Sequence, residues 1–389
     1  MADLRIGVIG YGARGGLAKH AHKPGEGSAV VAVCDPTERG LADAREVFGD
    51  SAAYVGELDE LLALGLDAVM ILAPDYAHAG IARRTLAAGL PTFCEKPLAI
   101  SLEDADDLLD LAKRHRARLY VGHNMRHMPV VRQMKRLIDE GRIGRVRAIW
   151  CRHFVGAGGD FYFKDWHAER ERVNTLLLQK GAHDIDVIHW LAGGYTRRVS
   201  GVGKLAVYGD ITDRRDNSDR RMWDWYSADN WPPTAQKELN PVVDVEDISM
   251  LQMELDNGVL ASYQQCHFTP DYWRNYTIIG DAGRIENMGD NGGDFIYLWD
   301  SRRGGAGKPD AVEVIARESG GHGGADPSLV AEFLRFARAG GHTEVSAVAA
   351  REAVATGCVG ADSLRAGGGM LPVPPLAAEV RQYFDAGQC

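Results

Sequence analysis

The strongest constraint on the fold is a glycine-rich turn that follows an apolar run at residues 4–9. A second apolar run, residues 29–34, ends in an aspartate. A strand, a G-x-G-x-x-G turn that opens a helix, a second strand and a terminal acid make one dinucleotide-binding unit. The glycines let the backbone approach a pyrophosphate, and the helix N-terminus offers N–H groups to it. The residues expected to contact the cofactor here are Gly10, Tyr11, Gly12, Ala13, Arg14, Gly15 and Asp35.

The acid at the end of the second strand indicates which dinucleotide is bound. The carboxylate of Asp35 would accept hydrogen bonds from both ribose hydroxyls of an adenosine, and it would repel a 2′-phosphate. The sequence therefore predicts NAD. Arg39 follows Asp35 closely, which leaves NADP open.

Strand and helix patterns alternate over the first 122 residues, which predicts a Rossmann-type, doubly wound parallel sheet. A capping box at Ser101 and Asp104 marks one of its helices. From residue 123 to 389 the pattern changes to long, half-exposed strands, which predicts an α+β domain with an open, mostly antiparallel sheet for substrate binding and oligomerisation. The domain boundary allows the last helices of the chain to pack back on the first domain. Asp326 and Pro327 predict the start of one of them, with Asp326 as N-cap.

Net charge, the length of the apolar runs and cysteine spacing limit the partners and the cellular location that we expect for this chain. The formal net charge is −10, and an acidic chain is a poor partner for nucleic acid or an anionic membrane. No apolar run reaches the roughly 18 residues of a membrane span, and we expect no signal peptide. The six cysteines, Cys389 among them, form no C-x-x-C pair. This spacing argues against a zinc cage or disulfide framework and favours a reducing, cytoplasmic location.

Lys96 is the first candidate for chemistry. It follows the predicted strand 91–94, and the carboxyl ends of parallel strands face the ligand crevice of a doubly wound sheet. A lysine at a strand end is ordinarily a solvated surface residue, but this position directs it toward the cofactor. A lysine whose pKa is depressed by burial can act as a base or hydrogen-bond donor to an alcohol that loses hydride.

An ordered set of motifs now resembles the Gfo/Idh/MocA family of oxidoreductases. Besides the glycine turn, the set comprises Ala73-Pro74-Asp75-x-x-His78, Glu95-Lys96-Pro97, Val121-Gly122-His123-Asn124-x-Arg126, Trp166-His167 and Lys180-x-x-His183-x-x-Asp186. The resemblance implies a C-terminal open-sheet domain and oxidation or reduction of a secondary alcohol on a sugar, cyclitol or related polyol with NAD(P). It also implies a homodimer or homotetramer.

The resemblance assigns roles residue by residue. Lys96 and His183 match the family's catalytic pair. Many members carry an aspartate four residues before the histidine, where this chain has Gln179, and Lys180 could take over its orienting role. The positions assigned to cofactor binding are Ala73, Pro74, His78, Glu95, Lys96, Asn124 and Trp166. Those assigned to substrate binding are Lys96, Arg126, Trp166, His167, Gln179 and His183.

Plainer interpretations of these residues stay open. His183 belongs to a helical stripe with Asp186 that could be core, and the spacing of His183, Asp186 and His189 admits a metal, although no fourth ligand is evident and no metal is expected. Arg126 could equally form a structural salt bridge. The Trp-rich insertion at 211–245 predicts a long loop near the site or at a subunit contact.

Three functions follow. The favoured one is an NAD-dependent dehydrogenase or reductase that transfers hydride to or from a carbon bearing a hydroxyl. In the second, a sugar is oxidised only transiently, for bond cleavage or epimerisation without net redox. The third is a nucleotide-sensing regulator without activity.

Overall fold

The computed structural model describes residues 2–302, 305 and 307–388, so Cys389 lies outside the described residues. The chain divides into two compact units. The first falls within residues 1–124, 320–354 and 376–389, and the second within 125–319 and 355–375. The end of the chain therefore contributes to both units.

The sheet of the first unit is wholly parallel, with strand order β3-β2-β1-β4-β5-β6. Its strands are β1 (Leu4–Ile9), β2 (Ser28–Cys34), β3 (Ala53–Val55), β4 (Ala68–Ile71), β5 (Thr92–Cys94) and β6 (Leu119–Val121). The order runs outward from β1 in both directions, as a doubly wound sheet requires. The predicted Rossmann-type fold is confirmed.

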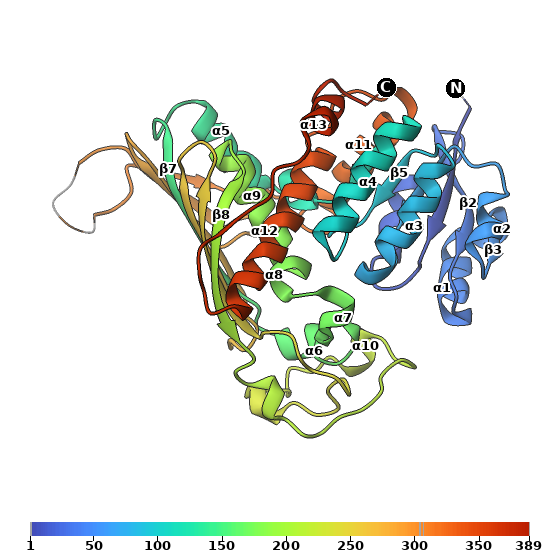
Figure 1. Ribbon diagram of the computed structural model, residues 1–389, viewed down its shortest axis with the longest axis horizontal. Helices are drawn as coiled ribbons and strands as arrows, with labels where there is room; N and C mark the ends of the chain where they lie inside the picture. Colours follow the sequence, from blue (N-terminus) through green and yellow to red (C-terminus); the bar gives the residue numbers. More distant parts are fainter. Residues whose placement is uncertain (1, 303–304, 306, 389) are drawn as a thin grey trace. The chain divides into compact units, whose positions relative to one another are not determined.

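Helices lie beside this sheet (Figure 1), and some of them supply apolar side chains to its core. They are η1 (Gly15–Ala21), α1 (Glu38–Phe48), η2 (Gly49–Ser51), α2 (Leu58–Leu62), α3 (Asp75–Ala87), α4 (Leu102–His115), α11 (Ala325–Ala339) and α13 (Ala378–Asp385). On one face the ring of Phe93 from β5 meets that of Phe333 from α11 at 5.4 Å. On the other, Gly7 of β1 leaves room for Leu61 of α2.

Of three predictions that rest on local sequence patterns in this unit, one is confirmed and two are wrong. The Ser101 hydroxyl accepts the N–H of Asp104 at 3.1 Å, which confirms the predicted cap of α4. The prediction of Asp326 as an N-cap is wrong, because Gly324 caps α11 and Asp326 lies within its first turn. The helix expected after the glycine turn is only the seven-residue 3-10 helix η1. It starts at the weak helix formers Gly15 and Gly16, and Pro24 follows its end closely.

The second unit contains a nine-stranded sheet in which only β7 and β10 pair in parallel. Its order is β14-β13-β12-β11-β7-β10-β9-β8-β15. The strands are β7 (Val146–Phe154), β8 (Thr196–Lys204), β9 (Ile248–Leu255), β10 (Leu260–Cys266), β11 (Trp273–Gly280), β12 (Arg284–Met288), β13 (Phe295–Trp299), β14 (Ala311–Val314) and β15 (Leu371–Pro372). The predicted open, mostly antiparallel sheet is therefore confirmed.

One face of this sheet is covered by helices. They include η3 (Asn124–His127), α5 (Pro129–Asp139), α8 (Leu176–Gln179), α9 (Gly181–Ala192) and the second half of α12 (Ala347–Arg365). Short elements lie at one end of the sheet: α6 (Gly158–Tyr162), η4 (Trp166–Ala168), α7 (Arg170–Val173), η5 (Tyr208–Asp210), α10 (Met222–Trp225) and η6 (Pro233–Ala235). Gly360 of α12 sits directly against Leu251 of β9, where a Cβ would come within 2.7 Å.

The opposite face of the sheet carries exposed apolar side chains among polar ones. Strand pairing puts one set of exposed apolar side chains on it: Trp150, Val202, Met250, Leu260, Met288, Phe295, Val312 and Val314. Trp150 is 52% exposed and Val314 58%. The same pairing places Arg152, Glu254 and Glu286 on this face.

The insertion 211–245 is held by polar contacts to Asp160 of α6. The Asp160 carboxylate accepts from Asn230 at 2.7 Å and from Gln236 at 3.1 Å, while its carbonyl accepts the indole N–H of Trp225 at 2.8 Å. The insertion is therefore an ordered part of the second unit. Among the described residues, no helix is both long and apolar enough to cross a membrane.

Candidate active site

The glycine turn lies at the carboxyl edge of the parallel sheet, and two of its glycines are required by close packing. Gly10 has a φ of 85°, and a Cβ there would lie 2.7 Å from the backbone of Ala73. At Gly15 a Cβ would meet the ring of Tyr11 at 2.9 Å. At Gly12 a Cβ would meet nothing within 4 Å. The turn thus leaves open space at its tip, where a pyrophosphate could approach the backbone.

Asp35 directly follows β2, and its carboxylate is hydrogen-bonded to the glycine turn. Its carboxylate, 7% exposed, accepts the N–H of Tyr11 at 2.7 Å and both the N–H and hydroxyl of Thr37, at 2.9 and 2.5 Å. A carboxylate offers about four acceptor positions. Ribose hydroxyls would therefore share Asp35 with these protein donors, and its negative charge lies directly beside the turn.

Arg14 joins the turn to two carboxylates. Its guanidinium donates to Glu95 at 2.7 Å and makes a two-pronged contact with Asp326 at 3.2 and 3.3 Å. Asn124 and His322 contact the same Asp326 carboxylate, each at 2.9 Å. Burial alone would raise the pKa of both acids, but Arg14 and the other donors hold each pKa below its usual value. No local sequence pattern marks Asp326 as a partner of Arg14, because the two residues lie 312 positions apart.

Glu95 also positions the next residue. Its second carboxylate oxygen accepts the backbone N–H of Lys96 at 2.9 Å, so one side chain ties the glycine turn to the start of the Glu95-Lys96-Pro97 segment. Lys96 follows β5 by two residues and its side chain is partly exposed. It therefore lies at the edge of the sheet that the sequence predicts for it.

His78 of α3 holds two loops of this edge together. Its Nδ1 lies 2.7 Å from the carbonyl of Pro97, and its Nε2 lies 2.8 Å from that of Ala73, which precedes Pro74 at the start of α3. Two carbonyl acceptors are both satisfied only when both ring nitrogens carry a proton. Burial lowers the pKa of His78, but contacts with Cys94, Asp75 and the Pro97 carbonyl outweigh burial and raise it to about 10. His78 therefore connects the segment that follows β4 to the segment that follows β5.

In the second unit, the helical segment that carries the Lys180-x-x-His183 motif is interrupted at Lys180. Residues 176–179 form α8, Lys180 is the N-cap of α9, and His183 lies in the first turn of α9. Gly181 allows α9 to pack closely on Tyr263, because a Cβ there would meet the ring at 2.9 Å. Lys180 and His183 are partly exposed, while Gln179 is buried.

A buried charge cluster holds the first turn of α9 on the sheet. The Asp184 carboxylate contacts Arg274 at 3.0 Å and His153 at 3.2 Å, and it accepts the Tyr276 hydroxyl. Burial raises the pKa of Asp184, but Arg274 and the other contacts lower it well below its usual value. Burial and Arg274 lower the pKa of His153 to about 3, so His153 is neutral. This cluster, which the sequence did not indicate, fixes the residue next to His183.

Lys180 lies with the aromatic residues of the Trp166-His167 segment. Its Nζ is 6.0 Å from the ring centre of Tyr162, which meets the His167 ring at 5.5 Å. The Trp166 ring stacks on His167 at 3.7 Å, and Asp165 binds the Nδ1 of His167 at 2.5 Å. The second unit therefore gathers Lys180 and the Trp166-His167 segment around Tyr162, and a substrate wall formed by these residues stays a prediction.

Arg126 has the structural role that the sequence left open. Its guanidinium makes two contacts with Asp186, at 2.8 and 2.6 Å, and both side chains are buried. This ion pair uses the Nε and Nη2 of the guanidinium, and substrate binding by Arg126 stays a prediction. The carboxylate of Asp186 is thus paired with Arg126, and the Nε2 of His189 lies 2.7 Å from the hydroxyl oxygen of Thr196. Within the described part of the chain, no three His, Cys, Asp or Glu side chains gather as a metal site.

Comparison with known protein families shows to which family the chain belongs. Residues 4–123 match an oxidoreductase family with an NAD-binding Rossmann fold, and residues 131–286 match the GFO/IDH/MocA C-terminal domain. The two matches cover more than half of the 389 residues.

The chain belongs to the Gfo/Idh/MocA family.

Curated relatives within this Gfo/Idh/MocA family carry different activities. Over 246 residues the chain is 30% identical to 2,7-anhydro-N-acetylneuraminate hydratase of Mediterraneibacter gnavus, covering 60% of this chain and 64% of that one. It is 30% identical over 201 residues to inositol 2-dehydrogenase 1 of Saccharopolyspora erythraea, covering 51% and 57%. The chain therefore spans less than two thirds of the length of these relatives.

Among solved structures, levoglucosan dehydrogenase in complex with NADH and levoglucosan matches with a TM-score of 0.77. The match covers 96% of this chain and 100% of that one at 19% identity. At this identity the likeness supports the Gfo/Idh/MocA fold. The first unit is thus the NAD-binding Rossmann domain of a Gfo/Idh/MocA oxidoreductase, and the open turn at Gly12 and the acid at Asp35 fit that cofactor.

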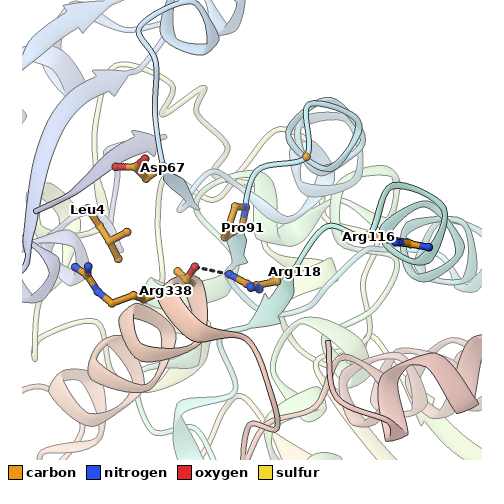
Figure 2. A pocket seen from close by; sticks show the side chains of 8 residues that line it. Leu4, Asp67, Pro91, Arg116, Arg118 and Arg338 are labelled. Atoms are coloured by element: carbon orange, nitrogen blue, oxygen red, sulfur yellow. Dashed lines mark hydrogen bonds between the residues drawn. The ribbon is translucent and has the colours of Figure 1, made fainter. Parts of the chain in front are cut away.

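A hollow on the Rossmann unit lies away from this site (Figure 2). Leu4, Asp67, Pro91 and Arg118 line it, each at or just before the start of a strand. It therefore lies at the amino edge of the sheet, whereas ligands bind at the carboxyl edge. The Arg118 guanidinium in it donates to the carbonyl of Ala337 at 2.8 Å, as the dashed line shows.

Proposed function

We propose that the protein is an NAD-dependent dehydrogenase that oxidises a secondary hydroxyl of a sugar, cyclitol or sugar derivative. The observation that supports this most directly is the bridge through Glu95, which joins Arg14 of the glycine turn to the N–H of Lys96. It ties the cofactor-binding turn to a lysine of the type that handles a hydroxyl proton.

The chemistry divides between cofactor and protein. NAD, when bound, supplies the hydride acceptor. In our proposal Asp35 and the glycine turn bind and orient it. Lys96 and His183 hold the substrate hydroxyl and accept its proton as the C–H bond breaks. Lys180 orients the substrate from the break between α8 and α9. A positioned acid–base group contributes a factor of about 10²–10⁴ in rate.

A panel of sugars and cyclitols, each with NAD and with NADP, tests the proposal by the absorbance of the reduced nicotinamide. NADH formation with at least one member, abolished in Lys96→Ala, supports the proposal. Absence of hydride transfer with every member and both cofactors would contradict it.

A second candidate is transient oxidation without net redox. It is favoured by the 30% identity to a hydratase, since hydration is itself redox-neutral. In that case the cofactor would co-purify with the protein and would not exchange during turnover. Substrate conversion without accumulation of NADH would distinguish this function from a dehydrogenase.

We also propose that the protein forms a homodimer or homotetramer through the exposed apolar face of the nine-stranded sheet. Trp150, Phe295 and Val314 on this face are each at least 41% exposed. Isologous pairing of two copies would bury the same residues on each.

A further inference from the structure

A continuous series of aromatic ring contacts runs through the second unit from the insertion to the Trp166-His167 segment. Trp223 meets Tyr226 at 6.2 Å, and Tyr226 stacks on Phe161 at 5.7 Å with 11° between the planes. Phe161 meets Tyr162 at 6.5 Å, and Tyr162 meets His167 at 5.5 Å. Figure 1 shows α10, which carries Trp223, beside α6, which carries Phe161 and Tyr162. The series joins the insertion to the proposed substrate wall.

The outer end of this series is open to solvent. Trp223 is 71% exposed and Tyr226 45%. A large exposed aromatic side chain is informative, because a Trp ring otherwise gains free energy from burial. Hydrogen bonds from Trp225, Asn230 and Gln236 to Asp160 anchor the insertion on α6. The segment that carries the exposed rings is therefore attached to the rest of the second unit.

The chemistry of the surface points to a carbohydrate. Pyranose rings present C–H faces that stack on aromatic rings, and their hydroxyls need polar partners at the rim. The same insertion also exposes the polar side chains of Asp229 and Lys237. A nucleic acid would also stack on aromatic rings, but it requires a positively charged groove, and the chain carries a net charge of −10.

We propose that Trp223 and Tyr226 form a subsite for a second sugar ring, so that the substrate is a glycoside or oligosaccharide rather than a free monosaccharide or cyclitol. The reacting ring lies beside Tyr162 and His167, and the next ring lies on Tyr226 and Trp223. This inference rests on the proposed function, because that function places the reacting ring at the substrate wall.

The test measures binding separately from turnover. The NAD-saturated full chain is titrated calorimetrically with disaccharides of glucose, galactose and N-acetylglucosamine, each against the corresponding methyl glycoside. Trp223→Ala and Tyr226→Ala are compared with Trp223→Phe and with Trp231→Ala. Trp231 is a matched control, 46% exposed in the same insertion, and no ring contact among the described residues links it to the series. Melting temperatures of all variants report folding.

We expect a disaccharide to bind more tightly than its methyl glycoside. Trp223→Ala and Tyr226→Ala should each weaken the disaccharide about tenfold and leave the methyl glycoside unchanged, as for the loss of one aromatic stacking partner. Trp223→Phe should restore most of the affinity, and Trp231→Ala should have no effect.

Three results would overturn the subsite: no disaccharide binds, both alanine variants bind the disaccharide as tightly as the wild type does, or only the oligomeric state changes in Trp223→Ala. The last result would assign the insertion to a subunit contact. Selective loss of disaccharide binding without any NADH formation would support the subsite while contradicting the dehydrogenase.

Discussion

The carboxylate of Glu95 accepts a hydrogen bond at 2.7 Å from Arg14, which lies 81 positions earlier in the glycine turn. Both residues belong to the Rossmann unit, and Asp326 completes the pairing of the guanidinium. The guanidinium of Arg14 is therefore paired with carboxylates of the protein, and we propose that its role in cofactor binding is to hold the turn in shape.

Glu95→Gln should weaken NAD binding about tenfold, because a neutral amide holds a guanidinium less firmly than a carboxylate does. NADH fluorescence titration measures the affinity. Asp281→Asn, an exposed acid paired with Arg147 in the second unit, is the control and should bind NADH normally. An unchanged affinity in Glu95→Gln would separate the bridge from cofactor binding.

Lys96→Ala should lower turnover by at least about 10²-fold and leave the NAD dissociation constant similar, because the lost group handles the hydroxyl proton. Steady-state rates and NADH titration measure the two quantities. Lys180→Ala should lower turnover less, in keeping with an orienting role. Unchanged turnover in Lys180→Ala would remove Lys180 from the mechanism.

Asp184→Asn should destabilise the second unit by up to about 3–5 kcal/mol, because it leaves the buried Arg274 with only the longer ion pair to Asp290, at 3.5 Å. The folded-state pKa of Asp184 is depressed, so its contribution is present above the unfolded pKa near 3.9 and is lost as the pH falls. Urea unfolding of the wild type and the variant at pH 7, 4 and 3 measures the difference between them, which should shrink only below about pH 4. Wild-type stability in the variant at pH 7 would show that the cluster contributes little.

His78 predicts the opposite pH dependence. Its folded-state pKa is raised from 6.5 to about 10, so its contribution to stability is complete below about pH 6.5 and is lost as the pH rises through about 10. Urea unfolding of the wild type and of His78→Asn at pH 6, 8 and 10 should show the gap between them narrowing with pH. A gap that stays constant would mean that His78 is neutral in the folded protein.

Trp150→Glu should convert an oligomer to a monomer, because it places a charge in the apolar sheet face that we propose to pair. Sedimentation velocity measures the state. Tyr76→Glu, at a residue of the Rossmann unit that is 41% exposed, is the control. A wild type that sediments as a monomer at all concentrations would contradict the oligomer itself.

Much of the fold follows from local patterns. The glycine turn, the apolar strands on either side of it and the Ser101 cap depend on residues a few positions apart, and the structure confirms each of them. The position of Lys96 followed from the rule that ligands meet the carboxyl ends of parallel strands. The site was harder. Whether Arg126 binds substrate or Asp186 was open, because a guanidinium suits either partner.

The sequence by itself determined the two kinds of sheet and the NAD-binding turn, and it proposed the residues that carry the chemistry, because periodicity and short motifs reflect local backbone and burial preferences. Only the tertiary structure decided that Asp326 pairs with Arg14, that Gly181 packs against Tyr263, and that Asp184 is held by Arg274. These contacts join residues far apart in the chain, and their geometry depends on how whole elements pack.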